Sequence, residues 1–221
     1  MATKATTGTK AKKQTAESMA DAYIKTLLIH GKAPASVFAF ADENGFSEGE
    51  FYKFYSSFEA LEMSVWEAMM TQTLDTLHAD AQFAKFSARE KLLAFYYTHL
   101  EVLKDRRSFV AMRWPELKEK ASTPKSLQAY KKAYNDFARV VVEEGIEKGE
   151  IKDRPKLSEQ CDKAFWVQLV FVVNYWIKDT SKAFEMSDAA VEKAVTLTFQ
   201  LLGESALDSA VDFARFLWQS K

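Results

Sequence analysis

The chain has 221 residues, of which 48% are hydrophobic and 14% aromatic, and this composition excludes an intrinsically disordered protein. Only 7 glycines and 4 prolines are present, which favours long helices over a turn-rich β-protein. The formal net charge of −1 gives no overall attraction to nucleic acid or to an anionic membrane. The one cysteine, Cys161, cannot form an internal disulfide, and its solitary presence favours a cytoplasmic location.

Residues 1–13 are rich in Thr, Ala and Lys and contain no apolar stretch, so they do not form a secretory signal. We expect a flexible basic arm. In one interpretation, Lys10, Lys12 and Lys13 reach into a DNA minor groove or along its phosphates. In the other, the arm is a solvated tail, as chain ends often are.

The next segment contains signals for three helices. The expected helices are 15–30, 36–43 and 47–54. Ser36 can cap the second helix, and Asn44-Gly45 ends it, because glycine accepts the positive φ of a tight turn. Ser47 and Glu50 have the spacing of a capping box at the start of the third helix. Two short helices around a glycine turn make a helix-turn-helix, whose second helix enters the major groove in DNA-binding proteins.

Small, aromatic and polar residues recur through this segment at fixed spacing. They are Gly31, Ala35-Ser36-Val37, Phe40-Ala41, Gly45-Phe46-Ser47, Gly49, Phe51-Tyr52-Lys53-Phe54-Tyr55, Ser57, Glu59 and Leu61. This order resembles the N-terminal domain of the tetracycline-repressor (TetR) family. The resemblance implies a DNA-binding head over residues 14–60. The DNA contacts that it implies are Ser36, Ser47, Glu50, Tyr52 and Lys53, with Lys10, Lys12 and Lys13 adding affinity.

Several positions depart from the family pattern. Phe58 stands where the family has a lysine, and Glu48 and Glu50 occupy positions where small or basic residues are usual. Between residues 36 and 62 the sequence has six acidic residues and a single cation, Lys53. A surface of this sign repels DNA phosphates. A second hypothesis therefore stays open, in which a TetR-fold protein has lost DNA binding and binds a small molecule or lipid. In that case Phe54, Tyr55 and Phe58 could form an exposed protein-docking patch.

The rest of the chain predicts long helices, so the fold class is all-α: a three-helix head on a larger helical bundle over residues 61–221. The expected helices are 57–83, 87–104, 106–120 with a break at Pro115, 124–148, 157–184 and 187–220. Ser87 and Glu90 form a second capping box, Gly149 stops the fourth of these helices, and Ser187 is the expected cap of the last.

The last two helices are strongly apolar. Residues 164–177 are too few to span a bilayer and include polar side chains, so we expect a buried helix and no membrane span. A helix that is apolar nearly all round needs partners on several sides. The family resemblance implies a homodimer through residues 157–184 and 187–220, whereas a monomeric bundle would bury the same residues internally.

Reactive groups are not clustered in the sequence. His30, His78 and His99 are far apart, and there is no phosphate-binding glycine loop, so we expect no enzyme activity, no cofactor and no metal site. Aromatic residues with a few polar groups instead suit a pocket for a hydrophobic compound or lipid. The candidate ligand-binding residues are Tyr96, His99, Met112, Trp114, Tyr134, Trp166, Phe171 and Asn174. The alternative is ordinary core packing, which is the usual role of aromatic stripes.

Two functional hypotheses follow. The first is a ligand-responsive TetR-family transcriptional regulator that binds double-stranded operator DNA as a dimer. Effector binding in the bundle would change the spacing of the two heads, so that both half-sites no longer fit. The alternative is the small-molecule or lipid-binding protein without DNA binding.

Overall fold

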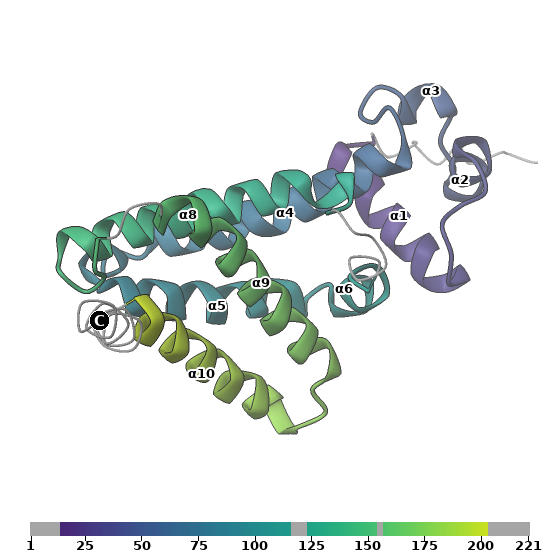
Figure 1. Ribbon diagram of the computed structural model, residues 1–221. Helices are drawn as coiled ribbons and strands as arrows, with labels where there is room; N and C mark the ends of the chain where they lie inside the picture. The colour runs from purple at the N-terminus through teal and green to yellow at the C-terminus, as the bar shows by residue number, and fades with distance from the viewer. Residues whose placement is uncertain (1–13, 116–122, 154–156, 203–221) are drawn as a thin grey trace, which may run out of the picture. The chain divides into compact units, whose positions relative to one another are not determined.

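The computed structural model describes residues 14–115, 123–153 and 157–202, with side chains of the last range from residue 162 onward. Lys10, Lys12 and Lys13 therefore lie outside the described residues. All regular elements of the described ranges are helical (Figure 1), which confirms the all-α fold class. The chain divides into two compact units, residues 1–62 and 63–221. No helix among the described residues is long and apolar enough to cross a membrane.

The N-terminal unit contains the three expected short helices. They are α1 (Ala16–His30), α2 (Val37–Asn44) and α3 (Glu48–Phe51), followed by the start of α4 (Phe58–Ala79). Gly45 has a φ of 72° and closes α2, and its N–H bonds back to the helix carbonyls. Because α2 and α3 are separated only by this turn, they form the predicted helix-turn-helix.

α3 is shorter than the predicted 47–54. After Phe51 the backbone continues in tight turns, with the Lys53 N–H bonded to the Glu50 carbonyl at 3.3 Å. Tyr55 is buried, and its hydroxyl donates to the Ala16 carbonyl of α1 at 2.9 Å. This long-range contact holds the turn in place, and the local sequence pattern does not contain it.

Phe58 occupies the centre of the N-terminal unit. Its ring stacks on Tyr23 of α1 at 5.2 Å and meets Phe40 of α2 and Phe51 of α3 edge-on, both at 5.5 Å. The expectation of an exposed patch of Phe54, Tyr55 and Phe58 is therefore wrong: Tyr55 is buried, Phe58 packs among the helices, and only Phe54 is exposed. The residue that replaces the family's lysine serves to hold α1, α2 and α3 together.

The second unit is a helical bundle. Besides the rest of α4, it contains the 3₁₀ turn η1 (Phe83–Lys85), α5 (Ala88–Lys104), α6 (Arg107–Arg113), η2 (Lys125–Leu127), α8 (Gln128–Glu147), α9 (Leu157–Lys178), η3 (Lys182–Phe184) and α10 (Glu185–Leu202). α8 packs against α5 and α9, and α10 packs against α5 and α9. The ends of the predicted helices 106–120 and 187–220 lie outside the described residues.

The joint between α9 and α10 differs from the prediction. α9 ends at Lys178 rather than at residue 184, and Ser187 lies inside α10 rather than capping it. Asp179 explains both differences, because its carboxylate accepts from the Ser181 N–H at 2.7 Å and from the Ser187 N–H and hydroxyl at 2.8 and 2.6 Å. The hydrogen bonds from Ser181 and then Ser187 lower the pKa of Asp179 to about 2, so the joint contains a fixed negative charge.

Arg107 of α6 holds the same joint from the other side. Its Nη2 donates to the carbonyl of Ile177 at 3.0 Å and to those of Trp176 and Asp179 at 3.4 and 3.5 Å. The guanidinium also lies over the rings of Trp176 and Phe184, at 5.3 and 5.1 Å. The carbonyl groups at the end of α9 thus accept hydrogen bonds from a cation, and a positive charge is favourable at a helix C-terminus.

Candidate functional site

The helix-turn-helix uses three of its predicted DNA-contact residues as caps. The Ser36 hydroxyl accepts the Ala39 N–H at 3.1 Å, and the Ser47 hydroxyl accepts the Glu50 N–H at 3.3 Å. The Glu50 carboxylate in turn accepts the Ser47 N–H at 2.9 Å and the Ser47 hydroxyl at 3.1 Å. These bonds to Ser47 lower the pKa of Glu50 and keep it ionised. The serines and Glu50 thus shape the turn, whatever else they contact.

Tyr52 and Lys53 follow α3 and project outward. Tyr52 is 55% exposed and Lys53 is also exposed. The structure therefore leaves these two side chains accessible directly after α3.

The charge around them is negative. Residues 14–62 contain eight Asp and Glu and three Lys, a balance of −5 with histidine neutral, whereas residues 1–13 contribute four lysines. Glu62 is one of these acids but is buried, where it accepts a hydrogen bond from the Tyr23 hydroxyl. Any attraction of this unit to a polyanion must therefore come from the lysines of residues 1–13 and from Lys25, Lys32 and Lys53.

A buried polar chain crosses the second unit from α8 to α4. The Thr73 hydroxyl donates to the Met69 carbonyl at 2.9 Å, so its oxygen is the acceptor for His99 Nδ1 at 2.8 Å. His99 Nε2 is then left to accept from the Tyr130 hydroxyl. Burial lowers the pKa of His99 to about 3, which keeps the ring neutral. The chain satisfies every polar group in it.

The predicted ligand residues divide into two groups. Tyr96, His99, Trp114 and Tyr134 are fully buried, and the hydroxyls of Tyr96 and Tyr134 bond to each other at 2.7 Å. Burial raises the pKa of both tyrosines, so they stay protonated. In this structure these four residues are packed core and not the walls of an open pocket.

The other four candidates are more accessible. Met112, Trp166 and Asn174 are half-buried, while Phe171 is 49% exposed on α9. Trp166 contacts the ring of Trp114 at 6.4 Å, which joins it to the buried group. The prediction omitted two residues of the same core, Thr73 and Trp66. Trp66 contacts Phe109, Trp114 and Tyr130, and its spacing on the apolar stripe of α4 could have revealed it.

An apolar groove of about 680 Å³ runs between α9 and α10. Its walls include four large side chains that are about half exposed or more: Val167 at 65%, Phe171 at 49%, Met186 at 52% and Leu197 at 55%. Alanines 189, 190 and 194 line the groove on α10. Contiguous exposed apolar surface of this kind marks an interaction site.

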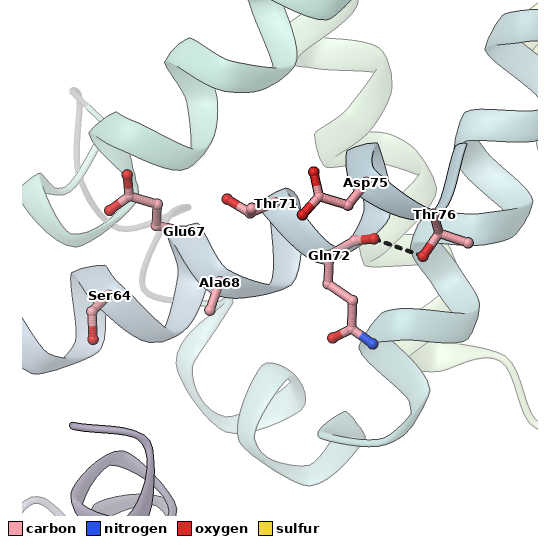
Figure 2. Close-up of a pocket in the computed structure, with 7 residues that line it drawn as sticks. All are labelled: Ser64, Glu67, Ala68, Thr71, Gln72, Asp75 and Thr76. Carbon is pink, nitrogen blue, oxygen red and sulfur yellow. Dashed lines mark hydrogen bonds between the residues drawn. The ribbon is translucent and has the colours of Figure 1, made fainter. Parts of the chain in front are cut away.

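A second hollow, of about 570 Å³, follows one side of α4 (Figure 2). It is lined by Ser64, Glu67, Ala68, Thr71, Gln72, Asp75 and Thr76. Figure 2 shows the Glu67 and Asp75 carboxylates along this side, and the Thr76 hydroxyl bonded to the Gln72 carbonyl at 2.7 Å. Its acidic, polar lining does not suit a hydrophobic or anionic ligand. Among the residues that the structure describes, no cluster of His, Cys, Asp and Glu could hold a metal ion.

Comparison with solved structures supports the fold. FadR from Bacillus subtilis, a transcriptional regulator in complex with stearoyl-CoA, is 20% identical and has a TM-score of 0.64, over 82% of this chain and 98% of that one. The fatty acid degradation regulator FadR from Bacillus halodurans is 22% identical with a TM-score of 0.65, over 89% and 98% of the two chains. A regulatory protein of the TetR family from Rhodococcus RHA1 is 17% identical with a TM-score of 0.57, over 86% and 98%.

No curated protein matches the sequence. The family model described as tetracyclin repressor-like, C-terminal domain, matches residues 91–217, which is more than half of the chain. The sequence resemblance in the head and the family match in the bundle cover different parts of the chain and agree with each other. Proteins of this family regulate transcription and are not enzymes. This chain belongs to the TetR family of transcriptional regulators.

Proposed function

We propose that this regulator binds operator DNA as a homodimer and releases it when a hydrophobic, fatty acyl-type effector binds the bundle. The observation that carries the proposal is the capped helix-turn-helix of α2 and α3, with Tyr52 and Lys53 exposed beside it. Such a regulator acts where the DNA is, so we expect it in the cytoplasm.

The groove between α9 and α10 supports the dimer. Both helices fall within the family-matched residues and present exposed apolar side chains that water disfavours. A second copy of the same groove would cover them, since homodimer interfaces are self-complementary and more apolar than other surfaces. In this proposal Phe171 serves the dimer rather than the effector.

The packed aromatic core supports a mechanism in which the effector shifts the equilibrium between two conformations of the bundle. Tyr96, His99, Trp114 and Tyr134 have no room for a ligand in this structure, so the bound state must rearrange them. An effector that binds the rearranged bundle more tightly moves the equilibrium toward it by its difference in affinity. A fatty acyl group suits this apolar interior, and the stearoyl-CoA bound by the Bacillus subtilis relative is of that kind.

DNA binding can be tested directly by fluorescence anisotropy. The full chain is titrated into random and genomic-fragment duplexes at low and moderate salt. We expect nanomolar binding to one fragment with a clear salt slope, and a slope smaller by about 1 in Lys53→Ala, because one phosphate contact is lost. Lys25→Ala, an exposed lysine on α1, is the matched control and should bind like wild type.

The −5 balance of residues 14–62 favours a second candidate, a TetR-fold ligand-binding protein without DNA binding. It predicts no binding to any duplex even at low salt. That result, obtained with folded protein, would replace the regulator proposal with this one.

A further inference from the structure

An open cavity of about 630 Å³ lies beside α8, toward Thr123 and the first turns of α9. Two of its cations are already paired: Lys132 Nζ lies 2.6 Å from Asp136, and Arg139 Nη2 lies 2.9 Å from Asp162. Lys131 differs. Its Nζ donates to the Thr123 hydroxyl at 3.3 Å, and among the described residues it pairs with no carboxylate. The volume falls in the range of small-molecule sites.

Lys131 links the lining of the cavity to the aromatic core, because it lies over the ring of Trp166. Lys131 Nζ lies 5.1 Å from the centre of the Trp166 ring, and Trp166 contacts Trp114 and Tyr130 at 6.4 and 6.3 Å. Trp166 is half-buried, whereas Trp114 and Tyr130 are fully buried. Trp166 thus contacts both Lys131, which lines the cavity, and the buried aromatic core.

Two buried polar atoms of neighbouring residues have no hydrogen-bond partner: the Oδ1 of Asn135, which lines the cavity, and the indole nitrogen of Trp114, whose ring contacts Trp166. Buried polar groups are normally paired, so each unpaired one needs an explanation. An amide N–H of a ligand would satisfy Asn135 and a carbonyl oxygen would satisfy Trp114; an acyl-CoA carries both groups, whereas an ionised fatty acid has no donor for Asn135.

We propose that this cavity binds the anionic head group of an amphiphilic effector, which Lys131 contacts directly, while Trp166 opens to admit the apolar chain toward Trp114. The proposal rests on the proposed function, because it gives the effector its head-group chemistry and its entrance. A carboxylate and a phosphate present the same acceptor oxygens to an ammonium group, so a fatty acid and a fatty acyl-CoA are both possible sources of the anion.

The test is equilibrium binding by isothermal titration calorimetry with the full chain. The ligands are lauroyl-CoA, laurate and the neutral ester methyl laurate. Lys131→Gln removes the cation, and Lys163→Gln is the matched control, since Lys163 is exposed on α9 and does not line the cavity. Circular dichroism checks that both variants are folded.

We expect Lys131→Gln to weaken binding of an anionic ligand on the order of tenfold or more, because a charge-assisted hydrogen bond is lost. Methyl laurate should bind both variants and wild type alike, and Lys163→Gln should change affinity by less than about twofold. An effect on laurate identifies the carboxylate as the anion, and an effect on lauroyl-CoA alone identifies the phosphates. If lauroyl-CoA associates faster with Trp166→Ala than with wild type, the result would support the proposal that Trp166 opens to admit the ligand.

Two results would overturn the inference: equal affinities of the Lys131 and Lys163 variants for every ligand, or no binding of either anionic amphiphile to wild type. An unchanged association rate in Trp166→Ala would overturn the role of Trp166. The regulator proposal is tested separately by DNA anisotropy. DNA binding together with a ligand affinity that does not depend on Lys131 would support the regulator proposal and overturn this one. A ligand affinity that depends on Lys131, in a protein that binds no DNA, would support this proposal and overturn the regulator proposal.

Discussion

The buried chain from Tyr130 through His99 to Thr73 predicts how the stability of the bundle depends on pH. His99 is fully buried and its pKa in the folded state is about 3, against 6.5 in an unfolded chain. Below pH 6.5 the unfolded state therefore binds a proton that the folded state does not. The stabilisation that the neutral, buried His99 contributes to the folded state is complete above pH 6.5 and is lost as the pH falls from 6.5 toward 3.

The size of the loss follows from the difference in pKa. Within this window each pH unit costs up to about 1.4 kcal/mol, so lowering the pH from about 7 to about 5 should cost about 2 kcal/mol. The carboxylates with lowered pKa, such as Asp179, lose their contribution only at lower pH.

Urea denaturation followed by tryptophan fluorescence measures this loss. All five tryptophans lie within residues 63–221, so the signal reports the unit that contains His99. His99→Gln is the informative variant, because it keeps an acceptor for Tyr130 and a donor for Thr73 but does not titrate. We expect wild type to lose about 2 kcal/mol over this pH range and the variant to lose much less. Equal losses in the two proteins would refute the assignment of a neutral, buried His99.

Three further changes test the packing and the interfaces. Phe58→Lys restores the residue type that the family has there, yet it should destabilise the N-terminal unit by roughly 3 kcal/mol, which faster amide exchange in α1 to α3 would show. The control, Phe54→Lys, should destabilise the unit by less than about 0.5 kcal/mol. Arg107→Met should lower stability by about 1–3 kcal/mol in urea denaturation, because three backbone carbonyls at the end of α9 lose their donor; an unchanged midpoint would show that water replaces it. Leu197→Glu should weaken dimerisation at least about tenfold in sedimentation equilibrium, because a carboxylate would be buried in the interface, while Val140→Glu, equally exposed on α8, should not.

Local signals predicted helix starts well. Ser36, Ser47 with Glu50, and Ser87 with Glu90 all cap helices as expected, because a capping box depends on residues only three apart. The prediction that Ser187 caps the last helix is wrong, and Ser187 has no Glu or Gln three residues later to complete a capping box. Its partner is Asp179, which only the folding back of α10 on α9 brings within reach.

The candidate ligand site likewise depends on contacts between helices, which the sequence alone does not reveal. The sequence selected the aromatic residues of the bundle, but a stripe such as Tyr96, His99 and Leu103 has the same spacing whether it lines a pocket or packs against other helices. Burial settled that question for this structure. Phe58 was likewise interpreted from a single departure in the family pattern, whereas its role depends on Tyr23, Phe40 and Phe51 in other helices. Lys131 became a candidate only once its neighbours were known.

The most direct test of the account combines its two halves. The labelled DNA fragment is first bound by the full chain at low salt, and lauroyl-CoA is then titrated into the complex while anisotropy is recorded. We expect saturable release of the DNA by wild type, and Lys131→Gln should need on the order of tenfold more ligand. A complex that forms but keeps its DNA at every concentration of lauroyl-CoA would contradict the account.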